Sequence, residues 1–166
     1  MPPALIFLVQ LALGYGPWML ILGAYGLPRL RRMDSAHIHR AIAALHSFRF
    51  FGLVFILPGV VGRGLPAGFA TFAAYGDFAT GVLAMLALLT FKMRPLFWLL
   101  VVAFNLVGAS DILTDYYHGV EFGLPALAGE LGAAYAIPML YVPLLMITHG
   151  VAFYWLARPQ AKDTTP

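Results

Sequence analysis

The sequence predicts an all-α protein, a membrane bundle of five transmembrane helices, and three observations support this. Of the 166 residues, 61% are hydrophobic and 10% are charged, whereas soluble domains carry about 25% charged residues. The mean hydropathy is +0.85. Five separate runs provide the roughly 20 apolar residues that a helix needs to cross a bilayer. We expect a single transmembrane domain over residues 1–166.

The first two helices are predicted at about residues 4–27 and 43–62. Pro17 lies near the centre of the first run, and its missing N–H is expected to distort that helix. The second run follows Asp34-Ser35, a pair typical of a helix N-cap. We therefore expect this helix to begin near Ser35, to follow the membrane surface, and then to enter the bilayer.

The other three helices are predicted at about residues 66–91, 95–117 and 134–157. Short glycine-containing or basic breaks at 62–65 and 92–94 predict tight hairpins on either side of the third helix. The longer connection after the fourth helix has room for a short helix at the outer interface. Pro138 and Pro143 predict an irregular fifth helix.

Basic residues fall in alternate connections, which predicts the orientation. They are Arg29, Arg31, Arg32 and Arg40 after the first helix, Lys92 and Arg94 after the third, and Arg158 and Lys162 after the fifth. The opposite side has Arg63 together with Asp115, Glu121 and Glu130. Since basic loops stay in the cytoplasm, we expect an outer N-terminus and a cytoplasmic C-terminus in a bacterial cytoplasmic (inner) membrane.

The composition and the motif content limit the kinds of catalytic and metal-binding sites that the chain can form. The chain has no cysteine, which excludes thiolate ligands, iron–sulfur clusters and thiol nucleophiles. The sequence contains no Ser/His/Asp set, HExxH motif or P-loop. We therefore predict no catalytic residue and no metal site, and an enzyme is the less favoured class. The net charge of +3 comes from loop residues, so nucleic acid is not an expected partner.

Asp77 is the most informative single residue, because it lies midway along the third apolar run. A carboxylate there costs about 2.5–3.5 kcal/mol. At 100° per residue, the small residues of this helix share the face of Asp77, and the large ones lie opposite. Small residues mark close helix contacts in lipid, so Asp77 is expected to point into the bundle.

The same helical geometry names partners for Asp77. One sector of the fourth helix carries Asn105, Gly108, Asp111 and Asp115, and one stripe of the second carries His39, His46 and Arg49. The rise per residue places Asp77 and Asn105 at one level. Arg49 is the cation available at this depth, so we expect an Arg49–Asp77 pair joined by Asn105. Asp111 is left without a cation. We therefore expect it to be protonated, hydrated, or hydrogen-bonded to Gln10 or Tyr15.

The cluster has two interpretations. It could fix the packing of three helices without any chemistry. It could instead be a ligand, ion or proton site, because ionisable residues inside a membrane are functional candidates. The candidate residues for such a site are Arg49, Asp77, Asn105, Asp111 and His149.

His149 and His46 also permit a cofactor hypothesis. A haem could lie between them if the second and fifth helices face each other, and a chlorin needs one axial histidine. The depths inferred for the two residues differ by several ångströms, which argues against the haem. Each histidine is more simply a hydrogen-bonded core residue.

The residues Arg49–Gly52, Gly64–Ala70, Gly76-Asp77, Gly81 and Asn105–Asp111 resemble a pattern in small bacterial multi-span membrane proteins without an assigned activity. The resemblance covers about half of the chain. It implies that Arg49, Asp77, Asn105 and Asp111 form one group.

Three functions follow as expectations. The first is a non-catalytic accessory or assembly subunit of a larger inner-membrane complex, with lipid, other membrane subunits or a second copy as partners. The second is binding or transport of a small molecule, lipid or proton through an Arg49/Asp77/Asn105 pocket. The third is a haem- or pigment-binding redox subunit that uses His149, His46 or both.

Overall fold

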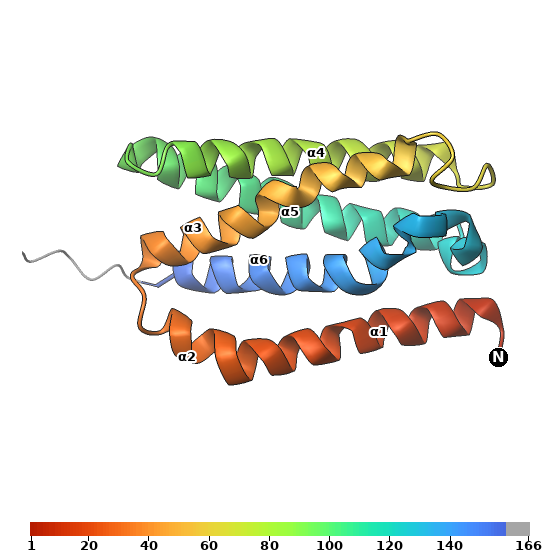
Figure 1. Ribbon diagram of the computed structural model, residues 1–166, viewed down its shortest axis with the longest axis horizontal. Helices are drawn as coiled ribbons and strands as arrows, with labels where there is room; N and C mark the ends of the chain where they lie inside the picture. Colours follow the sequence, from red (N-terminus) through yellow and green to blue (C-terminus); the bar gives the residue numbers. More distant parts are fainter. Residues whose placement is uncertain (159–166) are drawn as a thin grey trace, which may run out of the picture.

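The computed structural model describes residues 1–158, and all the regular structure in them is helical (Figure 1). The all-α class is therefore confirmed. In chain order the elements are α1 (Pro3–Ile21), η1 (Leu22–Gly26), α2 (Leu27–Leu30), α3 (Ser35–His46), η2 (Ser47–Ile56), α4 (Ala67–Leu89), α5 (Arg94–Glu121), η3 (Leu124–Tyr135), η4 (Ile137–Tyr141) and α6 (Val142–Leu156). Elements η1 and η4 are π-helical, and η2 and η3 are 3-10 helices. Lys162 and the last part of the predicted domain lie outside the described residues.

Within residues 1–158, four helical segments are long and apolar enough to cross a membrane, which suggests a membrane protein. They are Pro3–Leu30, Ala67–Leu89, Arg94–Glu121 and Ile137–Leu156. The predicted second span, residues 43–62, corresponds to a helical segment that begins at Ser35 and ends at Ile56, six residues before the predicted end. It is divided between α3 and η2, with 12 and 10 residues. Neither piece alone is as long as the other four.

The helices lie roughly parallel to one long axis (Figure 1). Helices α4 and α5 form an antiparallel hairpin, and η2 packs along α4. Helix α6 lies between this group and α1, which is the outermost helix in the view of Figure 1. Helix α1 contacts α6, η3 and η4, and Phe7 is its one buried residue. The bundle therefore has a tight core of α3–α6 and a more loosely attached α1.

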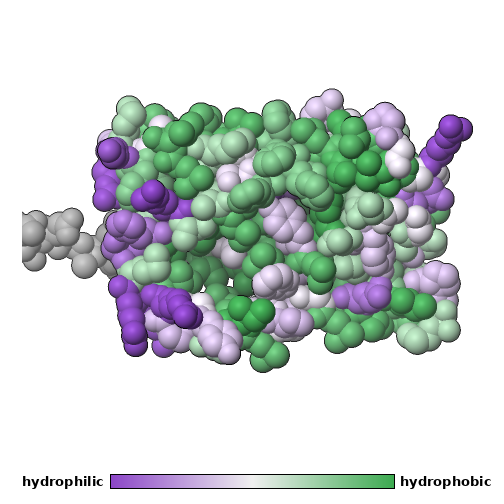
Figure 2. All heavy atoms as spheres, viewed as in Figure 1, coloured by the Kyte–Doolittle hydropathy of each residue, from purple (hydrophilic) through white to green (hydrophobic). Residues whose placement is uncertain are grey.

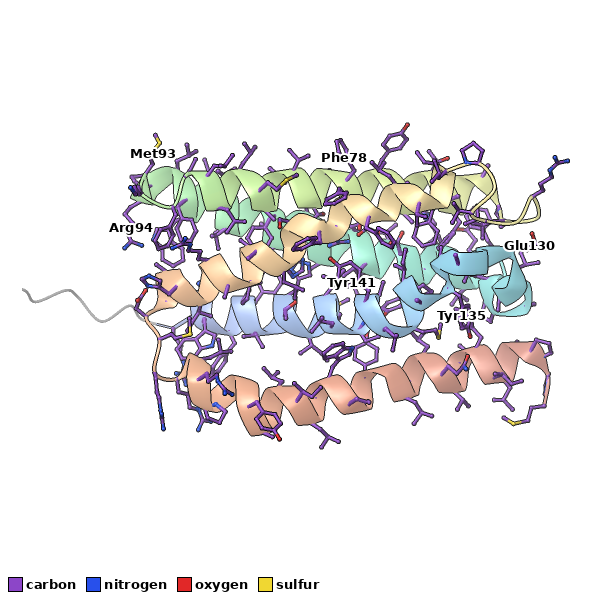
Figure 3. The ribbon with its side chains drawn as sticks, in the orientation of Figure 1. Phe78, Met93, Arg94, Glu130, Tyr135 and Tyr141 are labelled. Carbon is purple, nitrogen blue, oxygen red and sulfur yellow. The ribbon has the colours of Figure 1, made fainter. Side chains whose placement is uncertain are left out.

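Polar and apolar residues are separated along the long axis. The visible face has an apolar middle, and hydrophilic residues gather toward its two ends (Figure 2). Met93 and Arg94 lie at one end, whereas Glu130 and Tyr135 lie toward the other (Figure 3). The N-terminus lies at the Glu130 end (Figure 1). The middle of the bundle has the surface that a hydrocarbon layer requires.

The second helical segment starts with the predicted cap. Asp34 Oδ1 accepts a hydrogen bond of 3.0 Å from the His37 backbone N–H. The segment changes to a 3-10 helix at Ser47, where three residues per turn place every third residue on one face. That face carries His46, Arg49, Gly52 and Phe55, all of them buried. In an α-helix these positions would turn through about 180°, so the 3-10 geometry directs the whole stripe at the core.

The irregular turns lie near prolines. The π-helix η4 contains Pro138 and directly precedes Val142 and Pro143, which confirms the irregularity predicted there. Helix α1 stays α-helical through Pro17. Its irregular turn is η1, shortly before Pro28. Pro28 has no N–H to donate to the carbonyl four residues earlier. The π-helical turn η1 lies where this hydrogen bond is missing.

Candidate functional site

Arg49 is the centre of a buried polar cluster. Its side chain is fully buried. Its Nε donates to Asp77 Oδ1 at 2.6 Å, and its Nη2 donates to Asp111 Oδ2 at 2.5 Å. Its Nη1 donates to the Gly108 carbonyl at 3.2 Å. One guanidinium therefore joins η2 to both α4 and α5, and the predicted Arg49–Asp77 pair is confirmed.

The expectation for Asp111 is wrong, because Arg49 is its cation. A guanidinium has five N–H donors in a planar fork, so one arginine can serve two carboxylates. The residues expected to bond Asp111 have other partners. The Tyr15 hydroxyl lies 2.5 Å from that of Tyr116, and Gln10 accepts from Tyr135.

Asn105 does not join Arg49 to Asp77, as the sequence predicted, but lies on the far side of His149. Its Oδ1 lies 2.9 Å from His149 Nδ1, and its Nδ2 donates to the Val101 carbonyl at 2.8 Å. His149 Nε2 lies 3.4 Å from Arg49 Nη1. His149 therefore separates Asn105 from the guanidinium.

The predicted levels of Asp77 and Asn105 are also wrong. Gly76 lies against the Asp111 carboxylate, and Gly108 lies against Thr80, so Asp77 is level with Asp111. Asn105 precedes Asp111 by six residues and lies about 9 Å deeper at 1.5 Å per residue. The predicted helix ended at 117, whereas α5 continues to Glu121.

His46 and His149 contact each other directly. Their ring centroids are 4.1 Å apart, so their depths differ by no more than this distance. His46 Nε2 lies 3.0 Å from Thr148 Oγ1, and both nitrogens of His149 face polar partners. Rings in contact leave no room for a porphyrin between them, so these residues do not fit a bis-histidine haem.

Glycines make the room for this cluster. A Cβ atom at position 108 would lie 2.5 Å from Arg49 Nη1 and 2.6 Å from His149 Nε2. A Cβ atom at Gly52 would overlap the Asp77 carboxylate, and one at Gly76 would overlap that of Asp111. Gly52, Gly76 and Gly108 therefore leave the space that the charged groups occupy.

A cavity of about 420 Å³ lies against one side of the cluster. Its wall is mostly apolar, with two carboxylates, Asp77 and Asp115, and two tyrosines, Tyr15 and Tyr116. The apolar lining comes mainly from Phe7, Leu8, Leu11, Ala12, Phe55, Phe69, Ala73, Val120, Leu124, Pro125, Ile137, Pro138 and Val142. Leu8 and Val120 are themselves exposed, so the cavity reaches the surface of the bundle.

Asp115 lines the cavity but is not among the candidate site residues predicted from the sequence, although the sequence places it in one sector with Asp111. It was assigned to the outer side of the membrane, although it follows Asp111 by four residues on the same helix face. Asp115 Oδ1 is buried and has no hydrogen-bond partner among the described residues. Asp111 Oδ1 is also buried and unpartnered there.

A family model described as a domain of unknown function, DUF8737, matches residues 6–157. The matched region runs from α1 to the end of α6 and includes the whole cluster and the cavity. The match agrees with the resemblance to a family without an assigned activity. No curated protein and no solved structure matches the chain.

Proposed function

The chain belongs to the DUF8737 family, and we propose that it binds an amphiphilic cation inside the membrane. Such a ligand has a positively charged head and an apolar body. The head would lie beside Asp115 and Asp77, and the body would fill the apolar part of the cavity. Arg49 would hold Asp77 and Asp111 in place behind the ligand.

The membrane setting of this proposal has five spans in a bacterial cytoplasmic membrane. Besides the four long helical segments, the segment α3–η2 also spans the membrane in this proposal. Its 12 residues of α-helix and ten residues of 3-10 helix extend about 38 Å at 1.5 and 2.0 Å per residue. A hydrocarbon core is about 30 Å thick. The N-terminus lies outside and the C-terminus in the cytoplasm. Support comes from Arg94, which lies at the end opposite Glu130 (Figure 3), as the positive-inside rule requires.

The observation that carries the proposal is an imbalance of charge at an apolar cavity. Asp77 and Asp111 both pair with the guanidinium of Arg49, and Asp115 lines the same cavity as Asp77 without an ion pair in residues 1–158. Removing an ionised carboxylate from water costs several kcal/mol unless a cation compensates for it. At least one carboxylate is left for a proton or a bound cation, and Asp115 faces the cavity where either could arrive.

The cavity also suits the body of such a ligand. Its volume of about 420 Å³ lies in the range of roughly 300–1,000 Å³ that is usual for small-molecule sites. Phe7, Phe55 and Tyr116 contribute aromatic rings to its wall, and aromatic faces attract organic cations. A free metal ion would find few ligands in such an apolar wall.

Binding of a simple probe tests the proposal. We expect the purified protein to bind benzyltrimethylammonium more tightly than neopentylbenzene, its uncharged isostere, in calorimetric titrations. Asp115→Asn should weaken binding of the cation by at least about tenfold, because a charge pair at about 4 Å is worth about 4 kcal/mol at an effective dielectric constant of about 20. Glu121→Gln removes a nearby carboxylate outside the cavity and should leave the affinity unchanged. Equal binding by wild type and Asp115→Asn would refute the proposal.

A second proposal is that the chain is an accessory subunit of a larger membrane complex. Its support is the loose attachment of α1, which has one buried residue among 19. A partner helix could cover the rest of α1. Extraction in a gentle detergent should then recover a partner at a fixed ratio, and a single monodisperse species would argue against the complex.

A further inference from the structure

A second recess lies at the basic end of the bundle, between α1–α2 and α6. Gly14 of α1 lies directly against Met139 and Pro143, so the helices are in close contact there. Further along, they enclose a groove of about 360 Å³. It is lined by Met19, Leu22, Leu27, Arg31, Ile147, Gly150, Val151, Tyr154, Trp155 and Arg158. The groove is separate from the cavity beside Asp77, because the two share no lining residue.

The chemistry of the groove changes along its length. Met19, Leu22 and Ile147 provide an apolar inner part, and Arg31 and Arg158 provide two cations. We propose that the groove binds an anionic phospholipid. Its phosphate would lie between the two arginines, and an acyl chain would run along the apolar part.

Neither arginine has its charge neutralised within residues 1–158. The ion pairs of that region involve Arg49 and His37 instead. Arg158 lies over the rings of Tyr154 and Trp155, at 4.4 and 4.8 Å from their centroids. These contacts hold its guanidinium at the level where aromatic side chains mark the membrane interface, which is the level of a lipid phosphate.

Empty space at Gly150 supports an occupant with a chain. A Cβ atom at this position would meet no heavy atom within 4 Å, although Gly150 lines the groove. A free phosphate ion needs only the arginines. A lipid needs the arginines and the apolar space together, and the groove offers both.

Native mass spectrometry with added lipid tests this proposal. We expect phosphatidylglycerol to bind in preference to phosphatidylcholine, with inorganic phosphate as a poor competitor. Replacing Arg31 and Arg158 together by Gln should weaken phosphatidylglycerol binding roughly thirtyfold, since each basic residue near an anionic lipid contributes about fivefold. Arg32→Gln, which changes the charge at the same end outside the groove, should have at most about a fivefold effect.

Gly150→Leu gives a second test without any change of charge, because its side chain would occupy the groove. It should also reduce phosphatidylglycerol binding while the far-UV circular dichroism spectrum and the thermal unfolding temperature stay those of the wild type, which shows that the variant is folded. Phosphatidylglycerol binding at wild-type strength by Gly150→Leu would overturn the proposal. So would equal affinity for phosphatidylcholine, or competition by inorganic phosphate at concentrations similar to those of the lipid.

Discussion

Arg49 forms ion pairs with two buried carboxylates, so both of them depend on one side chain. Its Nε and Nη2 bind Asp77 and Asp111 at 2.6 and 2.5 Å. A buried ion pair adds little stability compared with an apolar core, but loss of one partner leaves an uncompensated charge. The cluster therefore constrains which residues can be changed singly.

We predict that Arg49→Met lowers the free energy of unfolding by about 3–5 kcal/mol, measured by denaturant titration in detergent. The triple variant Arg49→Met, Asp77→Asn, Asp111→Asn removes the charges together and should recover part of this loss. An Arg49→Met protein as stable as the wild type would contradict the bridging geometry.

The glycines beside the cluster give a second test at the residue scale. Gly108→Ala places a Cβ atom 2.5 Å from Arg49 Nη1 and should cost about 1–3 kcal/mol through overpacking. Gly16→Ala is the matched control, because nothing lies within 4 Å of its added Cβ. It should be neutral or stabilising by up to about 1 kcal/mol. Equal effects at both positions would show that the space around Arg49 is not limiting.

At the scale of elements, the segment α3–η2 shows what the sequence could and could not predict. The cap at Asp34 was predictable, because capping depends on neighbouring residues. The 3-10 geometry of η2 was not, since it is favoured here by packing of Arg49, Gly52 and Phe55 against other helices. A spacing of three between these residues was the available signal.

The inward faces of α4 and α5 were predicted correctly, because a regular helix fixes which residues share a face. Asp77, Asn105 and Asp111 are all buried as expected. The level at which the two helices meet was not predicted, since it depends on contacts between them, such as that of Gly76 with Asp111. The cavity was missed for a similar reason: it is formed by α1, α4, α5 and the segment before α6 together.

The Asp34 cap belongs to this scale as well. Asp34→Ala should destabilise α3 by about 1 kcal/mol, whereas Asp34→Asn should retain most of the cap. The hydrogen bond from the His37 backbone N–H lowers the pKa of Asp34. The contribution of the carboxylate is therefore complete above its unfolded pKa of about 3.9 and is lost as pH falls through the lower folded value. The difference in stability between wild type and Asp34→Asn should therefore be constant near neutral pH and change only in that acid range. A difference that changes with pH near neutrality would contradict this origin.

At the scale of the whole molecule, the chain orders its polarity along one axis and keeps one charged cluster inside. The proposed orientation can be tested with single cysteines, because the chain contains none. Arg63 and Met93 are exposed residues in turns at opposite ends of the bundle, so Arg63→Cys and Met93→Cys place one thiol at each end. A membrane-impermeant maleimide added to intact cells should label Arg63→Cys alone. Labelling of Met93→Cys alone would show that the topology is the reverse of the proposed one.

The central claim is that a cation with an apolar body binds beside Asp115, and a structure with a marked ligand tests it most directly. Crystals grown with 4-bromobenzyltrimethylammonium would locate the bromine by its anomalous signal. We predict a bromine peak inside the cavity among Phe7, Phe55 and Phe69, with the ammonium group toward Asp115 and Asp77, and no such peak in Asp115→Asn. A bromine peak found only on the lipid-facing surface, or an unchanged cavity peak in Asp115→Asn, would contradict the claim.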